Sequence, residues 1–221
     1  AGHTRVYALS SGSWTQLGSD INGEASNDYS GWSVSMNADG DRVAIGAYYN
    51  DGNGTNAGHT RVYALSSGSW TQLGSDVNGE ASNDESGYSV SLNSDGDRMA
   101  IGAPYNDGTG SNAGHVRIYE YSGGSWSQLG SDIDGEASWD ESGCAVSLNN
   151  AGDRVAIGAK YNGDGNAGHT RVYAYSDNAW TQLGSDIDGE AGSDNSGYSV
   201  SLNDAGDRVA IGAPYNDGNG T

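Results

Sequence analysis

Histidine and arginine recur together in this 221-residue chain, always two positions apart. Side chains at i and i+2 of a β-strand point to the same face, so each pair would share that face with the tyrosine that follows two residues later. A repeated face of this kind could bind an anionic or glycan partner at several equivalent points. The alternative is that each arginine neutralises nearby aspartates or holds neighbouring units together. The candidate ligand-binding residues are His3, Arg5, His59, Arg61, His115, Arg117, His169 and Arg171.

Carboxylates and amides recur at i, i+2 and i+4 around a glycine. Oxygen ligands at this spacing are how a loop wraps a hard cation, so we predict a possible Ca²⁺ site in each loop. The alternative is a solvated acidic turn that bonds its own backbone, because no set of six ligands is evident. The candidate metal ligands are Asp20, Asn22, Glu24, Asp76, Asn78, Glu80, Asp132, Asp134, Glu136, Asp186, Asp188 and Glu190, and a further aspartate could complete each set, from Asp28, Asp84, Asp140 and Asp194.

Tryptophan occurs six times, in two kinds of position. Four form a repeated series, which would either stack on sugar rings or pack between units: Trp14, Trp70, Trp126 and Trp180. Trp32 and Trp139 break the repetition, and we count both as candidate ligand-binding residues. The triplets beginning at Asn53 and Asn219 match the glycosylation acceptor pattern.

Catalysis is not expected, because it needs unlike groups in one asymmetric pocket and repetition places copies of one group at equivalent positions. The single cysteine, Cys144, has no unique base near it in the sequence, and the four histidines lack metal-ligand spacing within a unit.

Composition excludes several classes of protein. The chain has 37 glycines, a formal charge of −20 and a mean hydropathy of −0.64, which taken alone favours disorder. Its acidity would repel a phosphate backbone, so we expect no nucleic-acid partner. Apolar runs fall short of the roughly 18 residues of a membrane span, so no membrane insertion is expected.

Internal repetition outweighs the compositional signal. Ala-Gly-His recurs at residues 1, 57, 113 and 167, and residues 1–20 are identical to residues 57–76. The repeat divides a single domain into the units 1–56, 57–112, 113–166 and 167–221. A disordered tract would not keep its apolar positions in register in this way.

Four short strands are predicted for each unit and no helix. Alternation predicts strands around Val90 and Ile101, with an Asp-Gly turn between them, and two more at residues 115–121 and 126–129. Four antiparallel strands in about 55 residues favour an all-β propeller blade over a solenoid of stacked hairpins.

Ring closure follows from where the units begin. The sequence starts on a third strand and stops after a second, so we expect both chain ends to share one blade and close a four-bladed ring. Two alternatives remain open: an excerpt of a longer array, and a larger ring made by two chains.

Residues 86–91 together with residues 101–104 resemble the FG-GAP repeat, the blade unit of integrin α-subunits and of many microbial surface proteins. The resemblance recurs in every unit. Two departures stand out: serine replaces the phenylalanine of the motif, at Ser30, Ser86, Ser142 and Ser196, and residues 93–97 are too short for the family's usual calcium loop.

The resemblance implies a non-enzymatic extracellular or cell-surface module for binding or adhesion, whose partner is a glycan or a surface protein. The alternative is a structural repeat unit of a surface layer, stalk or filament, which would self-associate through its repeats.

Overall fold

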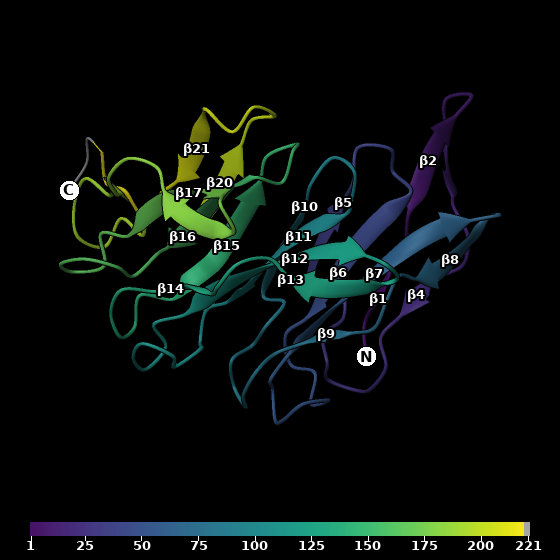
Figure 1. Ribbon diagram of the computed structural model, residues 1–221, viewed down its shortest axis with the longest axis horizontal. Helices are drawn as coiled ribbons and strands as arrows, with labels where there is room; N and C mark the ends of the chain where they lie inside the picture. Colours follow the sequence, from purple (N-terminus) through teal and green to yellow (C-terminus); the bar gives the residue numbers. More distant parts are fainter. Residues whose placement is uncertain (219–221) are drawn as a thin grey trace.

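The computed structural model describes residues 1–218, which form strands and turns and contain no helix. Three antiparallel sheets stand side by side in an arc, with a half-sheet at each end (Figure 1). This confirms the predicted all-β fold of repeated antiparallel units. A search of the described residues for a helix able to cross a membrane finds none.

Each complete sheet is a blade of four strands in sequence order, with a two-residue strand added beside the third. The first blade contains β5 (Ser33–Met36), β6 (Arg42–Ala47), β7 (His59–Ser66), β8 (Ser69–Gln72) and β9 (Val77–Asn78). The second contains β10 (Ser89–Leu92), β11 (Arg98–Ala103), β12 (His115–Ser122), β13 (Ser125–Gln128) and β14 (Ile133–Asp134). The third contains β15 (Ser142–Leu148), β16 (Arg154–Ala159), β17 (His169–Ser176), β18 (Ala179–Gln182) and β19 (Ile187–Asp188).

A tight turn joins the first two strands of each blade, as the Asp-Gly signal predicts. In the second blade, the Asn93 side chain donates to Asp97 at 2.8 Å and accepts from the Arg98 amide at 2.9 Å. Gly96 takes a positive φ of 64°, which favours glycine. The turn is therefore closed by its own side chains and backbone.

The hydrophobic core lies between blades. Val90 and Leu92 of β10 pack with Met99 and with residues of the preceding blade, among them Ala44 and Val62. The next interface repeats this arrangement around Val116, Ile118 and Ile157. Small residues allow the blades to approach closely, and the Ser89 hydroxyl donates to the Gly143 carbonyl at 2.7 Å. Each blade thus buries its apolar face against its neighbour.

Half-blades occupy the two ends of the arc. The first pairs β1 (His3–Thr4) with β4 (Ile21–Asn22) and β2 (Tyr7–Ser10) with β3 (Ser13–Gln16). The last pairs β20 (Ser199–Leu202) with β21 (Val209–Gly212). Each sequence unit therefore supplies the third and fourth strands of one blade, which we call its outer strands, and the first two strands of the next, which we call its inner strands.

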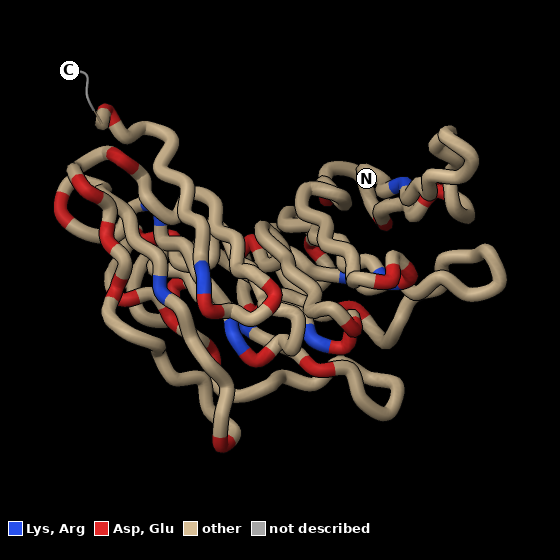
Figure 2. Tube along the Cα trace, turned by 90° about the horizontal axis from the view of Figure 1, so that it is seen from above, with Lys and Arg blue, Asp and Glu red and all other residues tan. Residues whose placement is uncertain are grey.

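The predicted four-bladed ring closed by a shared blade is not what the structure shows. The two half-blades are separate sheets, and they lie at opposite ends of the arc (Figures 1 and 2). The physical reason is geometric: the angle between blades is set by packing at each interface, and the steps along the described residues do not bring β21 back to β1. Acidic residues gather mostly in the loops around this arc (Figure 2).

Candidate functional site

Aromatic side chains meet at the inner ends of the first blades. The Tyr48 ring lies 4.7 Å from Trp32, 4.1 Å from Tyr49 and 5.6 Å from Tyr29, measured between ring centroids. These residues come from the turn before β5 and the turn after β6, which end side by side. We call Tyr29, Trp32, Tyr48, Tyr49 and Tyr88 the aromatic cluster. The sequence identified only Trp32 among them as a candidate.

Two members of this cluster are open to solvent. The side chains of Tyr29 and Trp32 are 49% and 52% exposed. They border an open pocket of about 380 Å³, whose other lining residues are Ala1, Gly2, Asn27, Ser30 and Gly31. Exposed aromatic faces beside amide and backbone polar groups can stack on an apolar ring face and hydrogen-bond its hydroxyls.

The aromatic contacts continue into the second unit. Tyr88 lies 5.8 Å from Trp32 and 6.3 Å from Tyr105, again between ring centroids. Burial raises the pKa of Tyr105 to about 12, so its hydroxyl stays protonated and able to donate. The cluster therefore spans two blades.

Next to the aromatic cluster lies an ion pair that the other described units do not repeat. Lys160 Nζ is 2.8 Å from Glu141 Oε2, and both side chains are 10% exposed. The ammonium also faces the rings of Tyr88 at 5.8 Å and Tyr161 at 5.0 Å. Burial opposes the charge of Lys160, but the hydrogen bond and charge of Glu141 outweigh it, so the pKa of Lys160 is raised.

Glu85 and Cys144 are perturbed in the same region. Burial, reinforced by the charge of Glu141, raises the pKa of Glu85 to about 7. Burial also raises the pKa of the Cys144 thiol to about 11. Cys144 is therefore a buried, protonated thiol rather than an activated nucleophile.

The predicted histidine and arginine faces lie between blades, not on an open surface. His59 and Arg61 of β7 are 1% and 6% exposed. Arg61 donates from Nη2 to the Asn22 carbonyl at 3.0 Å and has Nη1 3.4 Å from Glu24 Oε1. Arg117 and Arg171, with His115 and His169, repeat this placement. In these units the acidic loop of the preceding unit covers the face that the histidine and arginine share.

The residues predicted as calcium ligands have other partners or positions in the structure. In the first loop, Asp20 pairs with Arg5, and Asn22 lies in β4. Asp84 and its equivalents have a structural role, since Asp84 accepts from the Ala81 amide and from Asn106, each at 3.0 Å. Asn78, Asp134 and Asp188 likewise end the short strands β9, β14 and β19.

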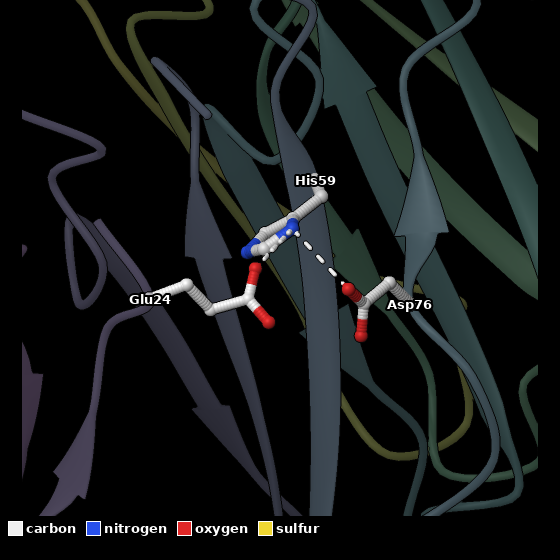
Figure 3. A group of neighbouring side chains, drawn as sticks. All are labelled: Glu24, His59 and Asp76. Carbon is white, nitrogen blue, oxygen red and sulfur yellow. Dashed lines mark ion pairs between the residues drawn. The ribbon is translucent and has the colours of Figure 1, made fainter. Parts of the chain in front are cut away.

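Acidic residues of two loops instead meet each of three histidines: the glutamate comes from the preceding unit and the aspartate from the histidine's own unit. Glu24 and Asp76 both approach His59, as Figure 3 shows. The same three residue types meet twice more among the described residues. The clusters are Glu24–His59–Asp76, Glu80–His115–Asp132 and Glu136–His169–Asp186. Glu190 belongs to the last unit and is not part of such a cluster in residues 1–218.

The remaining tryptophans and the acceptor asparagines have varied positions. Trp70 donates from Nε1 to the Leu17 carbonyl at 2.8 Å, and Trp126 and Trp180 make the equivalent contact. Trp139 is 62% exposed in the loop before β15. Asn53 donates its side-chain amide to the Gly79 carbonyl at 2.8 Å. The other acceptor, Asn219, lies outside the described residues.

Comparison with known families settles what the repeated units are. The family described as FG-GAP repeat matches residues 22–63 and 77–119, two consecutive units. These two segments are FG-GAP repeats. Each matched segment contains the first two strands of one blade and most of its third strand. Each also contains the glutamate of one histidine cluster, Glu24 or Glu80. FG-GAP repeats are typical of extracellular proteins.

Solved structures similar to this FG-GAP chain share its fold. A protein proposed to be a 6-phosphogluconolactonase, from Bacteroides uniformis, aligns with a TM-score of 0.63 at 10% identity, over 95% of this chain and 57% of its own. A protein from Lactobacillus plantarum aligns with a TM-score of 0.55 at 14% identity, over 94% and 51%. The chain thus spans about half the length of these proteins. No curated protein matches the sequence.

Proposed function

We propose that this protein is a non-enzymatic binding module of the cell surface and that its ligand is a glycan. The aromatic cluster carries the proposal. Trp32 and Tyr29 present half-exposed rings beside a pocket of about 380 Å³, and the cluster continues through Tyr48 and Tyr88. Sugars offer apolar ring faces for stacking and hydroxyls for the neighbouring amide and backbone groups.

The extracellular setting agrees with this ligand. FG-GAP repeats are typical of extracellular proteins, and a glycan of a neighbouring surface would be the natural partner there. A surface protein is the other partner that such an aromatic face would fit, since aromatic residues are enriched at the centres of protein interfaces.

Glycan-array binding tests the proposal, followed by titration of the retained sugar against the full chain. We expect Trp32→Ala to weaken binding at least tenfold, because a stacking contact is lost. The matched control is Trp14→Ala, which removes a 67% exposed tryptophan outside the cluster and should leave affinity unchanged. Absence of retention on any glycan, or equal loss from both variants, would refute a sugar site at Trp32. Parallel runs with calcium and with chelator show whether a cation assists.

Catalysis is not part of the proposal. Glu141 and Lys160, the polar pair that breaks the repetition, neutralise one another at 2.8 Å. A phosphorylated substrate would also meet a protein of formal charge −20. We therefore expect no hydrolysis of 6-phosphogluconolactone, which an ordinary turnover assay would check.

Assembly is the second candidate, and the two half-blades favour it. Ala210 of β21 is exposed, whereas the equivalent Ala44, Ala100 and Ala156 are fully buried beside a third strand. A further repeat, supplied by a second copy, would cover this edge and complete a blade. Light scattering across a hundredfold concentration range tests this: a rising mass without any glycan ligand supports assembly, and a constant monomer mass contradicts it.

A further inference from the structure

Three equivalent clusters between blades bring two carboxylates to one buried imidazole. His59 Nδ1 lies 3.9 Å from Glu24 Oε2 and 3.8 Å from Asp76 Oδ2 (Figure 3). His115 and His169 lie 3.9 Å from their glutamates and 3.6 and 3.8 Å from their aspartates. The glutamate always comes from the preceding unit, so each cluster joins two blades.

In the first cluster, each carboxylate has one oxygen engaged elsewhere. Gln72 donates to Asp76 Oδ1 at 2.6 Å, and Arg61 lies 3.4 Å from Glu24 Oε1. These partners hold the carboxylates so that Oδ2 and Oε2 face the imidazole. Contacts of this kind orient the ligands of a bound cation.

Two of the three imidazoles, those of His59 and His169, leave a buried Nδ1 without a hydrogen-bond partner in the part of the chain that the structure describes. Both ring nitrogens of His59 and Nδ1 of His169 are buried without one among the described residues. The side chains of His59 and His169 are only 1% exposed. A buried polar atom left unpaired is costly, and a cation between this nitrogen and the two carboxylate oxygens would pair all three.

We propose that each of the three clusters binds one divalent first-row transition cation, such as Zn²⁺, through the imidazole Nδ1 and one oxygen of each carboxylate. Ligand atoms on tetrahedral zinc lie about 3.4 Å apart, given bonds of about 2.0–2.1 Å. The nitrogen–oxygen separations of 3.6–3.9 Å need a contraction of a few tenths of an ångström, and the two carboxylate oxygens, which lie within 4.8 Å of each other, must close by the remainder. Glu24, whose side chain is 47% exposed, has the freedom to make that shift.

The chemistry of the donors selects the class of metal. Imidazole nitrogen suits zinc and its neighbours, whereas Ca²⁺ takes six to eight oxygens. Two carboxylates against the single guanidinium of Arg61 leave the first cluster with net negative charge, which the cation would neutralise. This inference concerns the joints between blades and does not depend on the glycan site.

Calorimetric titration of ZnCl₂ into the chelator-treated full chain at pH 7.5 tests it. We expect three equivalents to bind. The variant Glu80→Gln should lower that number to two, and the triple variant Glu24→Gln, Glu80→Gln, Glu136→Gln should lose all three. Each variant removes a half-exposed carboxylate, and circular dichroism checks that the fold is kept.

Glu190→Gln is the matched control, because the same residue type in the last unit faces no histidine cluster in residues 1–218. It should keep three equivalents. Zinc binding that survives the triple variant, or binding of Ca²⁺ with the same stoichiometry and affinity, would show diffuse attraction to an acidic surface and overturn the proposal. Absence of zinc binding to the unmodified chain would overturn it equally.

Discussion

The same twenty residues occur twice in this chain, at residues 1–20 and 57–76, in two different settings. In the first copy Trp14 is 67% exposed and Arg5 pairs with Asp20 at 3.0 Å. In the second copy Trp70 packs against the preceding unit and donates to the Leu17 carbonyl. Identical sequence thus yields a half-blade in one place and part of a blade in the other, and only the neighbouring unit differs.

The arginine shows how the neighbour acts. Arg61 reaches Glu24 and the Asn22 carbonyl of the preceding unit. Arg5 has no preceding unit beside it in the described residues, and its guanidinium turns to Asp20. This hydrogen bond lowers the pKa of Asp20. The preceding unit therefore provides some of the contacts that fix the side chains of each inter-blade cluster.

The largest expected difference between inner and end blades is at a glycine. A Cβ on Gly102 would collide with the Gly143 carbonyl of the next blade as well as with the Ser89 hydroxyl, whereas a Cβ on the equivalent Gly212 would meet atoms of Ser199 in its own half-blade. Gly102→Ala should lower the free energy of unfolding by about 3 kcal/mol, and Gly212→Ala by less than about 1 kcal/mol. Urea denaturation measures both. Equal losses would mean that blade contact is not what requires the glycine.

The Glu141–Lys160 pair departs from the repeat, and breaking it is expected to lower the free energy of unfolding nearly as much. Glu141→Gln leaves the buried Lys160 charge without its 2.8 Å partner and should cost about 2.5 kcal/mol. Glu190→Gln, at an acidic loop of the last unit, provides the comparison and should cost little. Thermal unfolding at pH 7 gives both values. If Glu141→Gln left the stability unchanged, the pair would have no stabilising role.

The twin tryptophans give the most direct test of the comparison. Trp70→Ala should cost about 2 kcal/mol, since a half-buried indole and its hydrogen bond are lost. Trp14→Ala should cost less than about 0.5 kcal/mol, as expected for an exposed side chain. Both variants change the same residue in the same local sequence, so similar losses would contradict the assignment of residues 1–20 to an exposed half-blade.

The smallest effect is expected at Glu85, and it depends on pH. Its pKa is raised from 4.5 to about 7 on folding, so the folded protein binds the proton more tightly and stability falls as pH rises from about 4.5 to 7. Glu85→Gln should therefore stabilise by about 1 kcal/mol at pH 8, after allowing for solvent screening, and by almost nothing at pH 4. Chemical denaturation at the two pH values checks this. A gain that is equal at both would exclude titration of Glu85 as its cause.

Much of the blade was predictable from sequence because its signals are local. Alternation around Val90 and Ile101 and the turn at residues 93–97 correspond to β10, β11 and their connection. The short strand β14 was missed, because two residues are too few to show a period of two. The angle between blades was not predictable, since equivalent units carry the same pattern whether the ring closes or stays open.

The site was harder to predict because its parts come from different units. Glu24 and His59 are 35 residues apart, and so are Glu80 and His115, a spacing that a search within one unit cannot reveal. The aromatic cluster was missed for the opposite reason. Tyr29 and Tyr48 occupy positions where the other units carry different residues, so the repetition drew attention away from them.

The half-unit offset between sequence repeat and blade has an evolutionary consequence. When unequal recombination adds or removes one copy of the repeat in the gene, the new segment supplies the outer half of one blade and the inner half of the next. The contacts that recur at every joint then find the same partners as before. The copy number, and with it the reach of the arc, can change between generations without a single compensating mutation.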